Sequence, residues 1–232
     1  MAEPTVPIYA QSDRAGITEL CPSTVGTILD VGGSTGEFAA HMKRHLGAER
    51  VYVADYSEKA LDVAKSKVDD VILVNLNKEG QLANALARRA PVDLVFCLCV
   101  LEHLYDPWRV VAELHTALPI GATIVTSVPN SQQLRFVWTI LTGNWKYRNT
   151  GLFDRTHIRF FSEDSAVKLM TGTGLQLVKV KRRILSKKLA KLNTLTLRRF
   201  ELFFAFQIEI AVRKVSDEVF DPGFCGARIA GA

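Results

Sequence analysis

The segment that most restricts how this chain can fold is Ile28–Phe38, where an apolar run enters a glycine-rich turn and then a helix-forming stretch. Gly32, Gly33 and Gly36 give the turn a backbone freedom that other residues lack. A strand that runs through such a turn into a helix is the first unit of a doubly wound α/β fold. The turn amides and the helix N-terminus together favour an anionic group, such as a carboxylate or a phosphate.

The alternation that this segment starts continues through residue 128. Short β-branched runs alternate with amphipathic stretches, which predicts parallel strands joined by helices. We predict strands at 27–31, 50–54, 71–74, 92–97 and 122–128, and helices at 36–46, 57–67, 81–89 and 107–118. Farther along we predict a helix at 162–171, strands at 175–184 and 206–215, and a basic helix at 187–199. The expected fold is one α/β domain over residues 1–232, with a doubly wound, mostly parallel seven-stranded sheet and one antiparallel closing strand.

Residues 130–161 break the alternation. They contain two tryptophans, Tyr147, Arg148 and several glycines and asparagines, and Asp154, His157 and Arg159 lie close together near their end. A connection of this length without a regular pattern is uncommon in a compact domain and is often functional. We therefore predict an insertion that covers an active site.

Composition narrows the class of protein. The chain is 48% hydrophobic with a formal net charge of +5, which permits an anionic substrate without requiring nucleic acid. It has no run of about 18 apolar residues, and its N-terminus lacks the apolar segment of a signal peptide. Its four cysteines, at 21, 97, 99 and 225, form no CxxC pair. We expect reduced thiols in a cytoplasmic protein, with no nucleic-acid partner.

The residues of the glycine turn discriminate between cofactors. A nicotinamide dinucleotide fingerprint that began at Gly32 would require glycine at positions 34 and 37, which are Ser34 and Glu37. Asp30 at the strand end would repel a pyrophosphate and attract an ammonium group. S-adenosylmethionine has an ammonium, a sulfonium and a carboxylate but no phosphate, so the turn fits it better. A tight turn without any ligand is the alternative.

The second predicted strand ends at another acid. Asp55 can accept two hydrogen bonds from a ribose diol, and its spacing from the glycine turn suits a neighbouring parallel strand. Tyr56 follows it and is placed to lie against an adenine ring. Taken alone, Asp55 is equally well interpreted as a capping or surface acid.

On these residues the chain resembles the class I S-adenosylmethionine-dependent methyltransferases. Within them it is similar to the small-molecule group that includes the ubiquinone-biosynthesis O-methyltransferases, over residues 26–165. The family motif D-x-G-x-G-x-G falls on Asp30, Gly32, Ser34 and Gly36, so serine replaces the middle glycine and Gly33 stands one position earlier. The hydroxyl of Ser34 is small enough to reach the methionine carboxylate.

The resemblance implies further contacts to S-adenosylmethionine. It places Asn75 and Leu76 at the adenine, with Asn75 at the position of a family aspartate; an amide oxygen accepts a hydrogen bond without a charge. It also places the backbone of Cys97 and Leu98 opposite the methionine amino group. As thiols, Cys97 and Cys99 are interpreted as core residues.

Two segments offer a group that could remove a proton from an acceptor hydroxyl. One is Glu102-His103, after the fourth predicted strand. The other is residues 151–162, which with Ser127–Asn130 resemble a subgroup of bacterial methyltransferases associated with glycosyltransferases and surface-polysaccharide genes. We predict His157, His103 and Asp154 as catalytic residues. Purely structural roles are the alternative: a His157–Asp154 hydrogen bond that holds the insertion, and packing of His103.

The pair Asp154 and His157 has metal-ligand spacing, but the sequence offers no third ligand, so no metal is expected. The predicted reaction is O-methylation of a small-molecule or sugar-containing acceptor. N-methylation of a small amine and non-catalytic binding of S-adenosylmethionine are the alternatives.

Residues 187–204 combine a basic stretch with Phe200, Phe203 and Phe204. A solvated helix face is one interpretation, and a docking surface for an anionic substrate or for membrane headgroups is the other. The oligomeric state is left open, a homodimer included.

Overall fold

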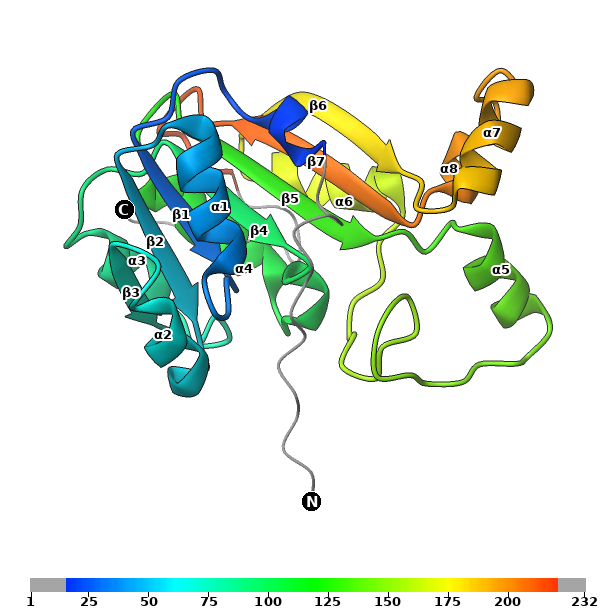
Figure 1. Ribbon diagram of the computed structural model, residues 1–232, viewed down its shortest axis with the longest axis horizontal. Coiled ribbons are helices and arrows are strands. Elements are labelled where there is room, and N and C mark those ends of the chain that lie inside the picture. Colours follow the sequence, from blue (N-terminus) through cyan, green and yellow to red (C-terminus); the bar gives the residue numbers. More distant parts are fainter. Residues whose placement is uncertain (1–15, 221–232) are drawn as a thin grey trace.

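The computed structural model describes residues 16–220, so Cys225 and both ends of the predicted domain lie outside the described residues. One seven-stranded sheet runs through this part of the chain, in the order β3-β2-β1-β4-β5-β7-β6 (Figure 1). Its strands are β1 (Thr27–Val31), β2 (Arg50–Asp55), β3 (Asp70–Leu73), β4 (Leu94–Leu98), β5 (Thr123–Pro129), β6 (Gln176–Arg183) and β7 (Gln207–Arg213). The strand β7 runs antiparallel to both of its neighbours, β5 and β6, and the other described pairs are parallel, which confirms the predicted sheet.

Helices cover both faces of this sheet. They are α1 (Glu37–Leu46), α2 (Glu58–Ala64), α3 (Gln81–Leu86), α4 (Pro107–Ala117), α5 (Leu134–Leu141), α6 (Glu163–Thr171), α7 (Lys187–Leu195) and α8 (Glu201–Phe204), with short 3-10 turns η2 (Ile17–Leu20) and η3 (Leu101–His103). Ser57 caps α2, Asp106 caps α4 ahead of Pro107, and Ser162 forms a capping box with Ser165 at α6. No helix among these residues is long and apolar enough to cross a membrane.

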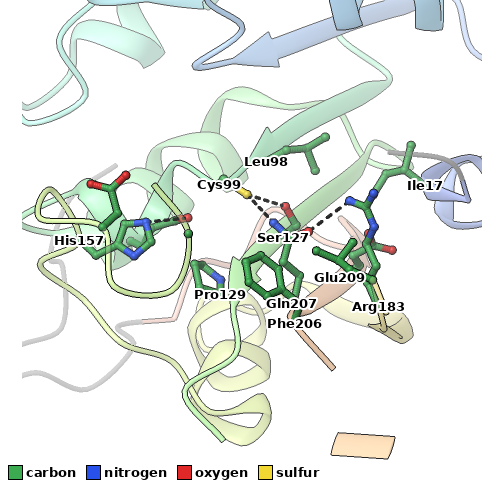
Figure 2. Close-up of a pocket in the computed structure, with 14 residues that line it drawn as sticks. Ile17, Leu98, Cys99, Ser127, Pro129, His157, Arg183, Phe206, Gln207 and Glu209 are labelled. Carbon is green, nitrogen blue, oxygen red and sulfur yellow. Dashed lines mark hydrogen bonds and ion pairs between the residues drawn. The ribbon is translucent and has the colours of Figure 1, made fainter. Parts of the chain in front are cut away.

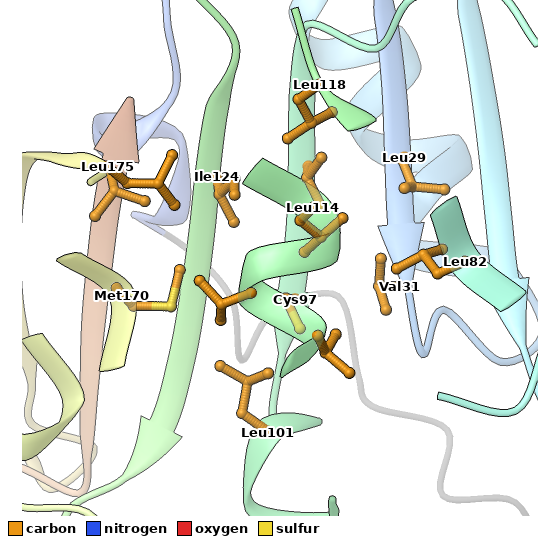
Figure 3. Packing of buried hydrophobic residues seen from close by; sticks show 14 of the residues in the cluster. Leu29, Val31, Leu82, Cys97, Leu101, Leu114, Leu118, Ile124, Met170 and Leu175 are labelled. Carbon is orange, nitrogen blue, oxygen red and sulfur yellow. The ribbon is translucent and has the colours of Figure 1, made fainter. Parts of the chain in front are cut away.

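Two apolar clusters hold the layers together. On one face, α3, α4 and α6 pack on the sheet through residues such as Leu82, Leu114 and Met170, which meet Leu29 and Ile124 of the strands (Figure 3). On the other face, η2, α1 and α2 cover a second cluster. Every residue of β1 and β4 is buried, as expected for central parallel strands covered on both faces. This rigid centre fixes the positions at which the two strands end.

The region after β5 differs from the sequence-based prediction in two places. The insertion contains a helix, α5, that was not predicted. The predicted helix 187–199 ends early: α7 stops at Leu195, and Leu197 and Arg198 adopt left-handed backbone conformations before a separate short helix, α8, that was not predicted. Neither residue is a glycine or proline, so the sequence gives no sign of the break. Most other element ends agree with the prediction to within two residues.

Candidate active site

Three strands bring the predicted cofactor residues to one edge of the sheet. Val31, the last residue of β1, pairs with Ala54 of β2 on one side and with Cys97 of β4 on the other. The amide of Gly32 then donates a hydrogen bond of 2.7 Å to the carbonyl of Ala54. The glycine turn follows β1, and Asp55 and Leu98 are the last residues of β2 and β4, so all three lie at the carboxyl ends of neighbouring strands, where ligands bind in doubly wound sheets.

The glycine turn is built from left-handed backbone conformations. Gly32, Ser34 and Gly36 have φ angles of 71°, 49° and 74°. Such angles are free for glycine and strained for serine, so Ser34 needs support from its surroundings. That support is a hydrogen bond of 2.9 Å from the Ser34 amide to Oδ2 of Asp55.

Asp55 itself is almost fully buried. Its second oxygen, Oδ1, accepts a hydrogen bond of 2.9 Å from the amide of Ser57, at the start of α2. Each carboxylate oxygen has two acceptor sites, so each retains one for a ligand hydroxyl. Asp55 thus fixes the turn and also offers the acceptors that a ribose diol requires.

Close packing explains why glycine is needed in the turn. A Cβ atom at Gly32 would overlap the side chain of Val100, and one at Gly33 would lie 2.7 Å from Oδ2 of Asp30. Asp30 is buried at the end of β1, and its carboxylate is therefore held directly beneath the turn. Any larger side chain at Gly32 or Gly33 would force the turn away from the strand ends.

These residues fit S-adenosylmethionine. Ser34 Oγ is buried and has no hydrogen-bond partner among residues 16–220, which leaves a hydroxyl for a ligand carboxylate. The N-terminus of α1 adds positive potential at the same turn, and Asp30 supplies the negative charge that an ammonium group requires. The donor and acceptor set therefore matches an amino acid moiety rather than a phosphate.

The adenine-side residues lie at the ends of β2 and β3. The side chain of Tyr56 is 80% exposed and leaves its ring free to stack. Asn75 is exposed, and its Oδ1 accepts a hydrogen bond of 3.0 Å from the amide of Asn77. The carbonyl of Leu76 accepts a hydrogen bond from Arg109, which ties this loop to α4. Roles for Tyr56, Asn75 and Leu76 stay predictions.

A cavity of about 350 Å³ extends from the end of β4 to the insertion (Figure 2). It is lined by residues from five parts of the chain: Ile17 of η2, Leu98, Cys99 and Glu102 after β4, Ser127 and Pro129 of β5, Gly151, Asp154 and His157 of the insertion, and Arg183, Leu185, Phe206, Gln207 and Glu209 around β6 and β7. The insertion therefore forms one wall of a pocket, and its role as the cover of an active site stays a prediction.

Polar side chains of β7 organise the wall opposite the insertion. Gln207 Nε2 donates a hydrogen bond of 2.9 Å to the sulfur of Cys99, and Arg183 Nη1 donates one of 3.2 Å to Oε1 of Gln207 (Figure 2). Arg183 also lies 3.9 Å from a carboxylate oxygen of Glu209, which is buried. Cys99 has a φ of 58°, unusual for a residue other than glycine. The sequence did not indicate any role for Gln207, Glu209 or Arg183.

The two predicted histidines meet in the structure. The ring centroids of His103 and His157 lie 4.8 Å apart in an edge-to-face contact. Nε2 of His157 lies 3.9 Å from Oε1 of Glu102, and the Glu102 carbonyl accepts hydrogen bonds from the amides of Ile158 and Arg159. Glu102 thus positions the insertion and places a buried carboxylate beside His157.

Burial, followed by the neighbouring His103, lowers the pKa of His157 to about 4, while the charge of Asp154 raises it. The imidazole is therefore neutral at physiological pH and has a free lone pair for a proton. Its low basicity makes it a weaker base than an unperturbed histidine.

Asp154 has a different partner from the one expected. Its Oδ1 accepts hydrogen bonds from the amide and the hydroxyl of Thr156, at 2.9 and 2.7 Å. The Thr156 carbonyl in turn lies 3.1 Å from Nδ1 of His103. Asp154 therefore shapes the turn before His157, whereas the carboxylate nearest His157 Nε2 is that of Glu102. The sequence placed Glu102 near the site but gave it no role of its own.

Glu102, His103 and His157 also have the side chains of a metal site, with ligand atoms within 4.8 Å of one another. The expectation of a metal-free site was based on the lack of a third ligand for Asp154 and His157. In the folded chain, the contact between residues 102 and 157 places Glu102 and His103 beside His157, so both become candidates for the missing ligands. Metal independence stays a prediction, and a chelator tests it.

Comparison with known proteins agrees with this geometry. Residues 12–180 match a family described as a methyltransferase domain. The chain is 35% identical over 127 residues to a ubiquinone biosynthesis O-methyltransferase of Albidiferax ferrireducens, covering 54% of this chain and 50% of that protein. It is 25% identical over 154 residues to the enzyme of that name from Coxiella burnetii, covering 66% and 64%. The chain thus spans about half to just under two thirds of these curated relatives.

Solved structures support the fold. The crystal structure of an S-adenosylmethionine dependent methyltransferase from Mesorhizobium loti has a TM-score of 0.62 at 17% identity, and the match covers 88% of this chain and 98% of that one. One from Archaeoglobus fulgidus has a TM-score of 0.63 at 16% identity, with coverages of 88% and 92%. At these identities the likeness extends to the fold alone.

Proposed function

The chain belongs to the methyltransferase domain family, and we propose that it is an S-adenosylmethionine-dependent methyltransferase that methylates a hydroxyl group of a small-molecule or sugar-containing acceptor. The observation that carries this proposal is the neutral, buried His157 in the wall of a pocket that starts at the end of β4. An imidazole in that state can accept the proton that a hydroxyl loses on methylation.

We assign cofactor binding to the strand ends. Asp30 and the backbone around Cys97 and Leu98 face the methionine amino group, and Gly32, Gly33, Ser34 and Gly36 hold its carboxylate end. Asp55 binds the ribose, and Tyr56, Asn75 and Leu76 surround the adenine. The bound cofactor supplies a methyl group that is activated because it is attached to a sulfonium. Transfer of this methyl group leaves a neutral thioether.

The chain's own residues have two tasks in this proposal. The pocket walls align the acceptor and exclude water, which is the main requirement of an in-line methyl transfer. His157 takes the hydroxyl proton, and the Glu102 carboxylate lies 3.9 Å from its Nε2. His103 packs against His157 and is the second candidate for the base, and Asp154 positions both through the 154–156 turn.

N-methylation of a small amine is the second candidate function. Three carboxylates, Glu102, Asp154 and Glu209, line the pocket against a single arginine, Arg183. Such a pocket attracts an ammonium group as readily as it orients a polyol. An amine must lose its proton before it attacks, so His157 would serve the same purpose in either reaction.

The experiment combines binding with turnover. Calorimetry with S-adenosylmethionine and S-adenosylhomocysteine measures cofactor affinity, and mass spectrometry detects methylated products from panels of phenols, glycans and amines. O-methylated products would support the proposal, and N-methylated products alone would replace it with the second candidate. Binding without turnover on any acceptor would favour a non-catalytic role.

The cysteines support a reducing, cytoplasmic setting as part of this proposal. Cys21, Cys97 and Cys99 form no disulfide in the described part of the chain. Burial raises the pKa of Cys21 to about 12 and raises that of Cys97 as well, so both are unreactive.

A further inference from the structure

Two segments beside the pocket have an unusual charge composition. We name residues 131–153 the insertion segment and residues 184–200 the β6–β7 segment. Together they contain no aspartate or glutamate, although the chain as a whole has 24 acidic residues. They contain eight basic residues, all exposed: Arg135, Lys146, Arg148, Lys187, Lys188, Lys191, Arg198 and Arg199. One of them, Arg198, pairs at 2.8 Å with Glu201, just beyond the β6–β7 segment. Positive charge still gathers on these segments, because neither contains an acid of its own.

The insertion segment also exposes an apolar helix face. Leu134, Trp138 and Leu141 are spaced four and three residues apart on α5, so they share one face. Their exposed fractions are 55%, 64% and 74%. The opposite side of α5 packs inward through Phe136, which stacks on Phe153. An isolated helix with its large apolar side chains turned to solvent is out of place on a purely water-exposed surface.

The β6–β7 segment repeats this combination. Leu192 and Leu195 are exposed on α7 among its lysines, and Leu197 projects from the left-handed turn after it. Leu195 is 81% exposed and Leu197 is 89% exposed. The turn thus holds a leucine almost wholly in solvent beside Arg198 and Arg199.

The two segments lie at the same end of the molecule, on either side of the pocket. The side chain of Asn130, just before the insertion segment, donates hydrogen bonds to the carbonyls of Leu202 and Ala205, around the end of α8. Figure 1 shows α5 and the α7–α8 pair projecting beyond the same end of the sheet. Gly151 of one segment and Leu185 of the other both line the cavity. A surface that contacts both segments would therefore border the acceptor pocket.

We propose that the insertion segment and the β6–β7 segment form a docking surface for an anionic lipid bilayer. Apolar side chains that enter the interface, interleaved with basic residues that meet lipid headgroups, are the two components of peripheral membrane binding. Where the proposed methyl transfer holds, this surface selects an acceptor with a polar head and a lipid tail: the head enters the polar pocket and the tail stays in the bilayer.

Charge decides against a second copy of this chain as the occupant. A symmetric dimer through this surface would bring the same eight basic residues of each copy together. Like charges across an interface are unfavourable, whereas anionic headgroups neutralise them. Exposed leucines and a tryptophan on short helices also match a fluid apolar layer better than a rigid partner.

The test measures binding of the whole chain to vesicles by co-sedimentation, with no cofactor or acceptor present. Phosphatidylcholine vesicles that contain phosphatidylglycerol should bind the protein, pure phosphatidylcholine should bind it at least tenfold more weakly, and high salt should release it. The double variant Leu195→Ser/Leu197→Ser and the double variant Trp138→Ser/Leu141→Ser should each lose at least tenfold in affinity. The triple variant Lys187→Gln/Lys188→Gln/Lys191→Gln should lose about a hundredfold, since each basic residue contributes about fivefold.

Matched controls use exposed residues far from these segments. Leu73→Ser and the triple variant Lys65→Gln/Lys78→Gln/Arg88→Gln should bind vesicles like the unaltered protein. Absence of binding to anionic vesicles would overturn the proposal. So would light scattering that shows a dimer which the Leu195→Ser/Leu197→Ser variant dissociates. Calorimetry with S-adenosylmethionine on the same preparations is independent of lipid, so failure of membrane docking and failure of the methyltransferase assignment give different results.

Discussion

The cofactor side of the sheet edge, at the ends of β1 and β2, and the acceptor side, beyond β4 and β5, are assembled from residues in different ways. At the ends of β1 and β2, the functional groups come from residues close together in the chain, because strand, turn and helix follow one another directly. Asp55, at the end of β2, accepts a hydrogen bond from Ser34 in the turn after the adjacent strand β1. Beyond β4 and β5, residues far apart in the chain must meet, as Glu102 and His157 do. The cofactor side is therefore local and rigid, whereas the acceptor side depends on long-range assembly of an insertion. This difference predicts that substitutions on the two sides affect separate measurable quantities.

The largest expected effect is on cofactor affinity, from a substitution in the glycine turn at Gly32, where a Cβ would lie against Val100. Gly32→Val should abolish measurable binding of S-adenosylmethionine, because its φ of 71° disfavours a β-branched residue and the added side chain overlaps Val100. Gly47→Val is the control: Gly47 also has a positive φ, of 67°, but a Cβ there would have no atom within 4 Å. Calorimetry on both folded variants checks this, and normal binding by Gly32→Val would remove the turn from the site.

The next largest effect tests the acceptor side. His157→Ala should lower turnover by about 10²–10⁴ if His157 is the base. Its affinity for S-adenosylmethionine should be nearly unchanged, because the imidazole faces the pocket and not the strand ends. His103→Ala provides the comparison, because it removes the packing partner and keeps His157. A stable His157→Ala enzyme with near-normal turnover would transfer the role to His103.

A smaller effect is expected at the ribose position. Asp55→Ala should weaken cofactor binding at least tenfold, since a hydrogen bond to a charged group contributes about 1.5–3 kcal/mol. Loss of its bond to the Ser34 amide should loosen the turn and add to this effect. Asp62→Ala, at an exposed position on α2, is the matched control and should bind normally. An unchanged dissociation constant in folded Asp55→Ala would contradict the ribose assignment.

The pH dependence of stability sharpens the account of His157. Its folded pKa of about 4 lies below the ordinary value of 6.5, so between these values the unfolded chain binds the proton more strongly. Stability should therefore decrease as the pH falls from about 6.5 towards 4. The decrease in melting temperature between pH 7 and pH 5 should be smaller in His157→Gln, which cannot titrate. Equal decreases in both proteins would contradict a buried, neutral imidazole.

No effect at all is expected from removing metal. Dialysis against a chelator should leave turnover and melting temperature unchanged, because the proposed proton transfer uses His157 directly. Loss of activity that zinc or another divalent ion restores would show that Glu102, His103 and His157 act as ligands instead.

The same contrast explains what could be predicted from the sequence. The doubly wound, mostly parallel sheet follows from the alternation of short segments, and the glycine turn follows from residues adjacent in the chain. The contact between Glu102 and His157 joins segments more than fifty residues apart, and no local pattern indicates it. The role of Asp154 was predicted from its spacing to His157, but its carboxylate bonds Thr156 because that partner is nearer in the turn. The break at Leu197 has no glycine or proline to mark it, and its exposed side chain gives no packing reason for it.

The most direct test of the account measures cofactor affinity and turnover on the same preparations of Asp55→Ala and His157→Ala. We predict that Asp55→Ala loses affinity for S-adenosylmethionine and recovers turnover at saturating cofactor. We predict that His157→Ala keeps its affinity and loses turnover at any cofactor concentration. If both variants lose affinity alone, or both lose turnover alone, the division into a cofactor side and an acceptor side is wrong.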